Sequence, residues 1–172
     1  MYSVNTTFTA RLLDVAIELT LSAGGHVEPL DLRIQPPRSC YEQLDGLMLM
    51  PRTIDKLRAQ LPGGHAGCYF IDGKINGISG YLLERLEIDK VELMSVIAAA
   101  QDENEVARWL RSRTNKEQYP EINKTLRRIR PAHSADIAYF KELYAETLRE
   151  CPQLEYVFDI IDADDHRMFA ST

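Results

Sequence analysis

The clearest periodic pattern in the chain lies in residues 47–61, which read Leu47-Met48-Leu49-Met50-Pro51-Arg52-Thr53-Ile54-Asp55-Lys56-Leu57-Arg58-Ala59-Gln60-Leu61. Apolar residues recur there at intervals of three and four, at Leu47, Met50, Ile54, Leu57 and Leu61. That spacing places one apolar stripe along an α-helix. Pro51 suits a first helical turn, where backbone amides lack helical partners, and the Pro62-Gly63-Gly64 run ends the helix. We therefore predict a core helix over residues 46–61.

Start signals predict further helices around this one. Ser39-Cys40-Tyr41-Glu42 has the form of a capping box, with Ser39 as N-cap, and Asp102 to Glu105 has the same form. Asp89 is a third N-cap candidate. Helical patterns continue at 78–86 and at 117–130, 134–150 and 153–161. Only the run from Cys68 to Ile71, before an Asp-Gly turn, reads as extended. The predicted fold class is all-α, a compact multi-helix domain with at most a minor extended hairpin near 68–76.

The N-terminal part divides from the rest. Residues 1–22 predict a helix that is apolar on two sides, with only a narrow polar stripe of Arg11, Asp14 and Glu18. Residues 23–38 hold two glycines and three prolines, which predict a crossing segment, and residues 39–172 form the main helical domain. A two-sided apolar helix has to be covered on both sides. Two interpretations stay open: the helix lies deep in its own core, or it packs against a second subunit and makes a homodimer.

Composition limits the classes of function. The 172 residues carry a net charge of −6, which disfavours sequence-independent binding to nucleic acid. The basic cluster of Lys124, Arg127, Arg128 and Arg130 leaves RNA contact as a minor alternative to a solvated helix end. Three cysteines without CxxC spacing predict a reducing, cytoplasmic compartment. The chain contains no stretch of about 18 uncharged apolar residues, so the sequence predicts no membrane span.

Metal and cofactor motifs are not apparent. The four histidines are far apart in sequence and show no zinc-binding spacing. The acidic run Asp162-Ala163-Asp164-Asp165-His166 lacks the glycine and the late glutamate of an EF-hand loop, so a solvated C-terminal cap is the favoured interpretation over a cation site. We predict no metal and no cofactor. No nucleophile motif or P-loop is present either.

A charged face is the candidate site. On a helix at 100° per residue, Arg52, Asp55 and Lys56 lie opposite the apolar stripe and Arg58 lies at its edge. One interpretation is a solvent-exposed face with an Arg52–Asp55 pair. The other is that the face lines a cleft, where Arg52 as a forked donor and Lys56 as a point charge bind an anionic ligand.

Two linked motifs in this region resemble the signature of a bacterial family of unknown function, DUF5069. They are Pro37-Arg38-Ser39-Cys40-Tyr41-Glu42-Gln43-Leu44-Asp45-Gly46-Leu47 and Leu49-Met50-Pro51-Arg52-Thr53-Ile54-Asp55-Lys56-Leu57-Arg58-Ala59. The resemblance extends over about 33–169. Cys40 stands where the family pattern has Pro and Asp45 where it has Gly, and the latter bears on how the helix begins.

The resemblance implies no activity, but it implies that Ser39, Tyr41 and Glu42 belong to one pattern with the charged face. The leading hypothesis is a homodimeric binding or regulatory module for a partner or a small anionic ligand. The alternative is an enzyme on a small metabolite, with Asp55 as general acid or base and Tyr69 or Tyr41 nearby. The ligand-binding candidates are Arg52, Asp55, Lys56, Arg58, Ser39, Tyr41, Glu42 and Tyr69.

Overall fold

The structure, a computed structural model, describes residues 27–69, 71, 77–134 and 136–170. Its elements in chain order are β1 (Gln43–Leu44), β2 (Leu47–Met48), α2 (Met50–Arg58), α3 (Ile78–Arg85), α4 (Lys90–Ala99), α5 (Glu103–Arg113), the 3-10 turn η1 (Lys116–Gln118), α6 (Tyr119–Leu126), the 3-10 turn η2 (Pro131–His133), α7 (Ile137–Leu143), α8 (Ala145–Glu150) and α9 (Val157–Phe169). The described residues are thus mostly helical, which confirms the all-α prediction.

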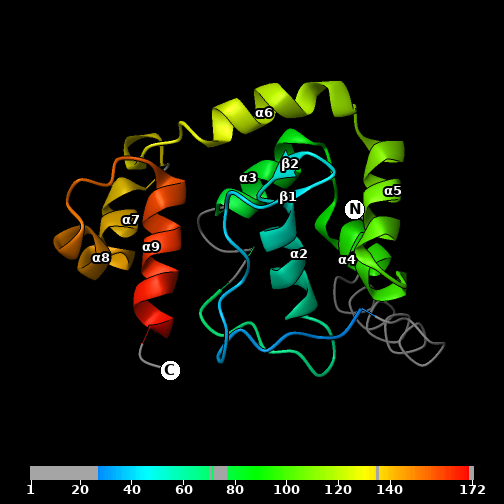
Figure 1. Ribbon diagram of the computed structural model, residues 1–172, viewed down its shortest axis with the longest axis horizontal. Coiled ribbons are helices and arrows are strands. Elements are labelled where there is room, and N and C mark those ends of the chain that lie inside the picture. Colours follow the sequence, from blue (N-terminus) through cyan, green and yellow to red (C-terminus); the bar gives the residue numbers. More distant parts are fainter. Residues whose placement is uncertain (1–26, 70, 72–76, 135, 171–172) are drawn as a thin grey trace, which may run out of the picture.

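Helix α2 is the centre of the fold. All five residues of the predicted apolar stripe are buried, and so is every residue from Met50 to Leu57. In Figure 1, α2 stands in the middle of the molecule, between the α4–α5 pair and the α7–α9 group, with α6 running across one end. Because α2 is covered all round, its charged residues also lie inside the protein, and their charges need partners there.

The predicted core helix begins four residues late, at Met50, because a hairpin occupies the preceding residues. Strands β1 and β2 pair antiparallel, Leu44 opposite Leu47, and both turn residues have positive φ, 53° at Asp45 and 91° at Gly46. A two-residue Asp-Gly loop favours this turn, since both residue types tolerate positive φ. Leu49 then takes a left-handed conformation, with φ of 67°, directly before α2.

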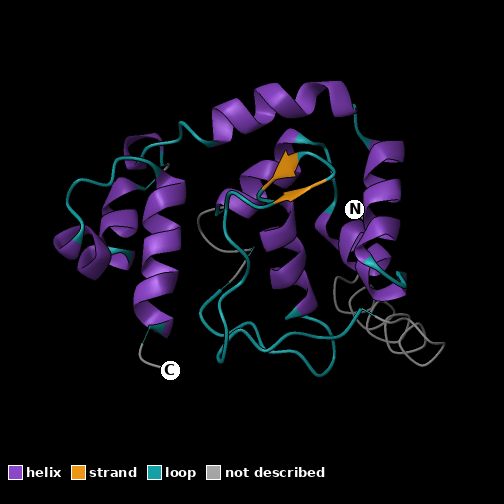
Figure 2. Cartoon of the chain, in the orientation of Figure 1, coloured by secondary structure: helices purple, strands orange, loops and turns teal. Residues whose placement is uncertain are grey.

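The hairpin is completed by a side chain from α6. Asn123 Nδ2 donates to the Gly46 carbonyl at 2.7 Å, and Asn123 Oδ1 accepts from the Met48 amide at 2.9 Å. Figure 2 shows the two strands beneath α6. The predicted extended piece near 68–76 is not seen in its described part, where the Tyr69 amide closes a turn on Ala66 at 2.9 Å; residues 72–76 lie outside the described residues.

Two of the three predicted caps are confirmed and one is wrong. Asp89 caps α4 by accepting from the Glu92 amide, and Asp102 caps α5 by accepting from the Glu105 amide. Ser39 caps no helix, because residues 39–42 form a turn, with the Glu42 amide on the Ser39 carbonyl. The Ser39 hydroxyl is used instead in a contact with α9.

The C-terminal helix differs most from the prediction. It runs over Val157–Phe169 instead of 153–161, so the acidic run from Asp162 is helical and not a solvated cap. Both Asp164 and Asp165 are buried. The predicted helix 134–150 is two short ones, α7 and α8, divided at Tyr144.

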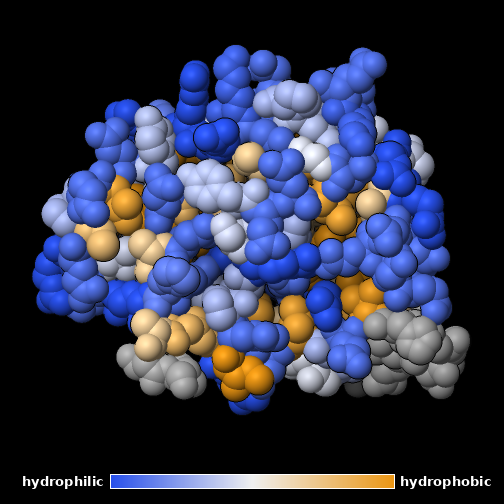
Figure 3. All heavy atoms as spheres, viewed as in Figure 1, coloured by the Kyte–Doolittle hydropathy of each residue, from blue (hydrophilic) through white to orange (hydrophobic). Residues whose placement is uncertain are grey.

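No helix in the described part of the chain is long and apolar enough to cross a membrane. The face in Figure 3 is largely hydrophilic, with apolar atoms showing in small areas between polar ones. The predicted helix at 1–22, and the homodimer contact through it, lie outside the described residues and stay predictions.

Candidate functional site

A row of carboxylates on α9 faces the middle of the protein. Asp159, Asp162 and Asp165 recur at intervals of three, which places them on one side of the helix. Tyr41 Oη donates to Asp159 at 2.6 Å, and the Cys40 amide and the Ser39 hydroxyl both donate to Asp162. The row therefore fastens residues 39–41 to α9. The predicted site residues Ser39 and Tyr41 therefore serve the docking of α9, whereas Glu42 is exposed.

Asp165, the last of the row, pairs with Arg52 of α2. Arg52 Nη1 lies 2.6 Å from Asp165 Oδ2 and also donates to the Arg38 carbonyl at 3.0 Å. The Arg52 side chain is 2% exposed and Asp165 is 9% exposed. Arg52 Nε is buried and has no hydrogen-bond partner among the described residues. One guanidinium donor is therefore left over after the carboxylate is used.

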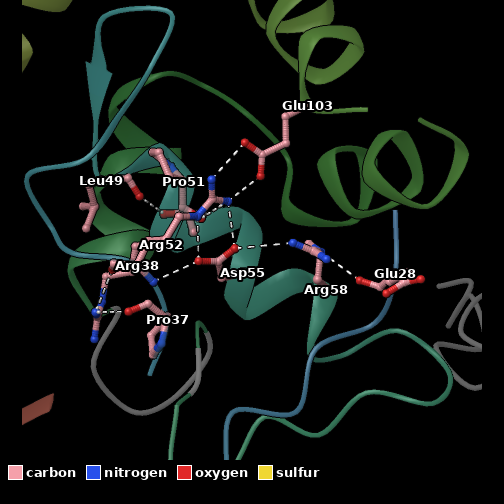
Figure 4. A network of polar contacts seen from close by, with 10 residues as sticks. Glu28, Pro37, Arg38, Leu49, Pro51, Arg52, Asp55, Arg58 and Glu103 are labelled. Atoms are coloured by element: carbon pink, nitrogen blue, oxygen red, sulfur yellow. Dashed lines mark hydrogen bonds and ion pairs between the residues drawn. The ribbon is translucent and has the colours of Figure 1, made fainter. Parts of the chain in front are cut away.

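In Figure 4 the Arg38 backbone joins Arg52 to a network centred on Asp55. Arg38 grips its carboxylate with Nη2 at 2.7 Å and Nε at 2.9 Å, and the Arg38 amide adds a third bond. Arg38 also bonds Glu103 of α5. Arg58 Nη1 lies 3.8 Å from Asp55 Oδ1, and Arg58 Nε donates a hydrogen bond to the Glu28 carbonyl. Asp55 and Arg58 therefore tie α2 to the crossing segment and to α5.

A cavity of about 1060 Å³ opens on the α9 side of α2. Its floor includes Arg52, Lys56, Tyr69 and Asp165. Its walls come from α3, α7, α9 and the end of α6, and they are largely apolar or aromatic: Ile78, Tyr81, Ile129, Tyr139, Phe140, Leu143, Tyr144, Val157, Ile161 and Met168. We call this cavity the α2–α9 cleft. Its size is that of a site for a small organic molecule.

Lys56 is the least compensated charge on the cleft floor. It is 8% exposed, and its Nζ makes no hydrogen bond or ion pair with a described residue, only a contact 5.9 Å from the centre of the Tyr69 ring. Burial, and next the positive charge of Arg52, lower the pKa of Lys56 to about 8.

Of the two described buried aspartates that line the cleft, Asp164 is held by Thr147 and Arg167, and Asp165 is also already engaged. Asp165 Oδ1 accepts from Tyr69 Oη at 2.6 Å, while Oδ2 takes Arg52. Burial and the hydrogen bond to Asp165 raise the pKa of Tyr69, so this hydroxyl stays protonated. When Lys56 is protonated, the floor residues that the structure describes carry two positive charges, on Arg52 and Lys56, against the one negative charge of Asp165. Such a surplus is what an anionic ligand would neutralise.

The structure therefore divides the residues that the sequence proposed. Arg52, Lys56 and Tyr69 come together in the cleft, and the solvent-exposed interpretation of their face is wrong because all three are buried. Asp55 and Arg58 lie outside it. Sequence reasoning missed Asp165 and the aromatic wall. The three-residue spacing of Asp159, Asp162 and Asp165, which begins among the apolar residues Phe158, Ile160 and Ile161, was a usable signal for an inward carboxylate row.

The lowered pKa of Lys56 makes a prediction about stability. In the pH range between about 8 and the ordinary value of 10.5, the unfolded chain binds a proton at Lys56 that the folded chain does not. Stability therefore rises with pH through that window as far as Lys56 contributes. Lys56→Met removes the cost of burying the charge, so we expect it to stabilise the protein by roughly 1–3 kcal/mol at pH 7.

The gain should shrink as the pH passes from 8 towards 10.5, where the native Lys56 is already neutral. Urea unfolding of both proteins across this range measures it, and taking the difference removes the contribution of the buried tyrosines. A gain that is absent at pH 7, or independent of pH, would contradict the assignment of Lys56 as a buried, uncompensated amine.

Fold and site together define a small helical protein with a cation-floored, aromatic-walled cleft. The family model of DUF5069, described as a domain of unknown function, matches residues 34–167. The chain therefore belongs to this family, which confirms the resemblance drawn from the motifs in 37–59. None of the curated proteins compared with the chain matches it.

Proposed function

We propose that this protein binds a small organic anion with an apolar body in the α2–α9 cleft. The observation that carries the proposal is the charge on the described part of the cleft floor: two buried cations, Arg52 and Lys56, lie beside Asp165, whose two oxygens are already engaged by Arg52 and Tyr69. In the described part of the chain, the buried Lys56 amine has no acceptor and the buried Arg52 Nε–H has no partner, and an anionic ligand would supply an acceptor for both.

The walls supply the second half of the chemistry. Apolar and aromatic side chains predominate beyond the floor, and several of them, including Tyr81, Tyr139, Leu143 and Met168, are exposed at 37% or more. Large apolar side chains left accessible around one concave site favour the apolar part of a ligand. Just beyond the end of α6, Arg128 lines the cleft as an exposed cation.

Binding of defined anions tests the proposal. Phenyllactate and phenyl phosphate, each with an aromatic body and an anionic end, should bind by calorimetry with a Kd at or below about 1 mM. Uncharged phenylethanol should bind at least about tenfold more weakly, because it leaves the floor cations uncompensated. Lys56→Met should weaken phenyllactate binding by about tenfold or more.

Lys116→Met is the matched control. Lys116 is half exposed and pairs with Asp45 at the hairpin turn, away from the cleft, so its loss should leave binding unchanged. If neither anion binds, or if Lys116→Met weakens binding as much as Lys56→Met, the cleft is not an anion site and the proposal fails.

A further inference from the structure

The environment of Lys56 suits a reactive, nucleophilic amine as well as a cation that binds an anion. Lys56 lies on the cleft floor, it is buried, and no carboxylate in the described part of the chain pairs with it. Arg52 stands one helical turn before it on α2, so a second positive charge opposes its protonation. A lysine that is desolvated beside another cation is the arrangement by which proteins make an amine nucleophilic.

We infer that Lys56 forms an imine with the carbonyl group of an oxo acid bound in the α2–α9 cleft, while Arg52 receives the carboxylate of that acid. This inference rests on the proposed anion binding and names its substrate class. Arg52 and Lys56 both approach the Tyr69 ring, with Cζ 5.5 Å and Nζ 5.9 Å from its centre. An acid with a carbonyl group next to its carboxylate can bind both side chains at once, with the carboxylate at Arg52 and the carbonyl group at Lys56.

The chemical step is a condensation. The neutral Lys56 amine attacks the carbonyl carbon, a C–N bond forms and the carbonyl π bond breaks to give a carbinolamine. Loss of the oxygen as water, with the two hydrogens of the amine, leaves a C=N bond. No oxidant or reductant takes part. An aromatic or branched body on the acid would then lie against the wall formed by Tyr81, Tyr139, Phe140 and Tyr144.

The titration of Lys56 supports this chemistry. With a pKa of about 8, half of the amine is neutral at that pH, whereas an ordinary lysine would be almost wholly protonated. The groups that set this value are Arg52, Cys40, Asp165 and Cys68, in addition to burial itself. Tyr69, which contacts the amine, stays neutral because its pKa is raised.

Reductive trapping tests the inference on the full chain. Phenylpyruvate is added with sodium cyanoborohydride, which reduces an imine faster than a ketone, and the product is measured by intact mass and peptide mapping. We expect one adduct per chain, located at Lys56, whose rate of formation rises with a midpoint near pH 8. Lys116→Met should label as fully as the parent protein, since Lys116 is an exposed lysine paired with Asp45.

Two variants separate reactivity from binding. Lys56→Met and Lys56→Arg should both lose the adduct completely, while Lys56→Arg keeps the positive charge and should therefore weaken the binding of phenyllactate, the alcohol that has no carbonyl group, less than Lys56→Met does. Circular dichroism confirms that both variants are folded. Retention of a single adduct in either variant would place the amine elsewhere and overturn the assignment.

Phenyllactate distinguishes the failure of this inference from the failure of the proposed function. If phenyllactate binds but phenylpyruvate yields no adduct, or adducts scattered over exposed lysines, the imine is refuted and anion binding stands. If phenyllactate does not bind and no adduct forms, both are refuted.

Discussion

Asp165→Ala is expected to lower the free energy of unfolding by about 3–5 kcal/mol, the usual cost of removing one partner from a buried ion pair. Asp165 takes Arg52 Nη1 on one oxygen and Tyr69 Oη on the other, both at 2.6 Å. Among the described residues, its removal leaves the 2%-exposed Arg52 side chain without a counterion, bonded to the Pro37 and Arg38 carbonyls and beside a second buried cation, Lys56. The cost therefore comes from the stranded charges more than from the lost contact.

Urea unfolding at pH 7 measures the loss, with Glu146→Ala as the control. Glu146 pairs with Arg149 on the surface, where both side chains are more than half exposed, and an exposed pair contributes at most about 1 kcal/mol. The double variant Asp165→Ala with Lys56→Met should recover part of the loss, because one of the two stranded cations is then gone. A loss for Asp165→Ala no larger than that of the surface control would refute the buried pair.

Phe158→Ala should cost about 3–5 kcal/mol, the range for emptying an aromatic site in a core. Phe158 is fully buried on α9 and meets the Tyr41 ring edge to face, with centroids 5.2 Å apart and planes at 87°. Tyr41 is in turn bonded to Asp159, the next residue of the helix. The substitution therefore removes apolar packing at the point where α9 meets the segment before the hairpin.

Thermal and urea unfolding measure this effect, and two controls bracket it. Phe158→Leu keeps most of the apolar volume and should cost clearly less than the alanine variant. Ile34→Ala removes a large side chain that is 69% exposed and should stay within about 0.5 kcal/mol of the parent. Equal losses for Phe158→Ala and Ile34→Ala would show that α9 does not pack on this core.

The sequence predicted those parts of the fold that depend on one element at a time. The stripe from Leu47 to Leu61 marked the core side of α2, and Asp89 and Asp102 marked the starts of α4 and α5, because helical period and capping are local properties. The Asp45-Gly46 turn was also local, but the apolar pattern running through it masked the hairpin. The prediction of Ser39 as a cap was wrong because its hydroxyl donates a hydrogen bond to the charged Asp162 carboxylate.

The site could be predicted only in part, since a helix pattern does not say what covers its polar face. Arg52 and Lys56 both line the cleft, whereas Asp55, placed beside them by the same projection, is engaged by Arg38. Asp165 was missed because its partner Arg52 lies 113 residues away. The spacing of Asp159, Asp162 and Asp165 indicates a shared helix face, but which residue of α2 that face meets is a property of tertiary packing.

The separation between Arg52 and Asp165 also has a consequence for the order of synthesis. A ribosome adds roughly 5–20 residues per second, so the 113 residues between them take roughly 6–20 s to be made. For most of that interval the nascent chain contains all of α2, but it does not yet contain Asp165, the carboxylate that neutralises Arg52. Burial of Arg52 is unfavourable until then, and the central helix of the protein is therefore among the last to reach its final surroundings.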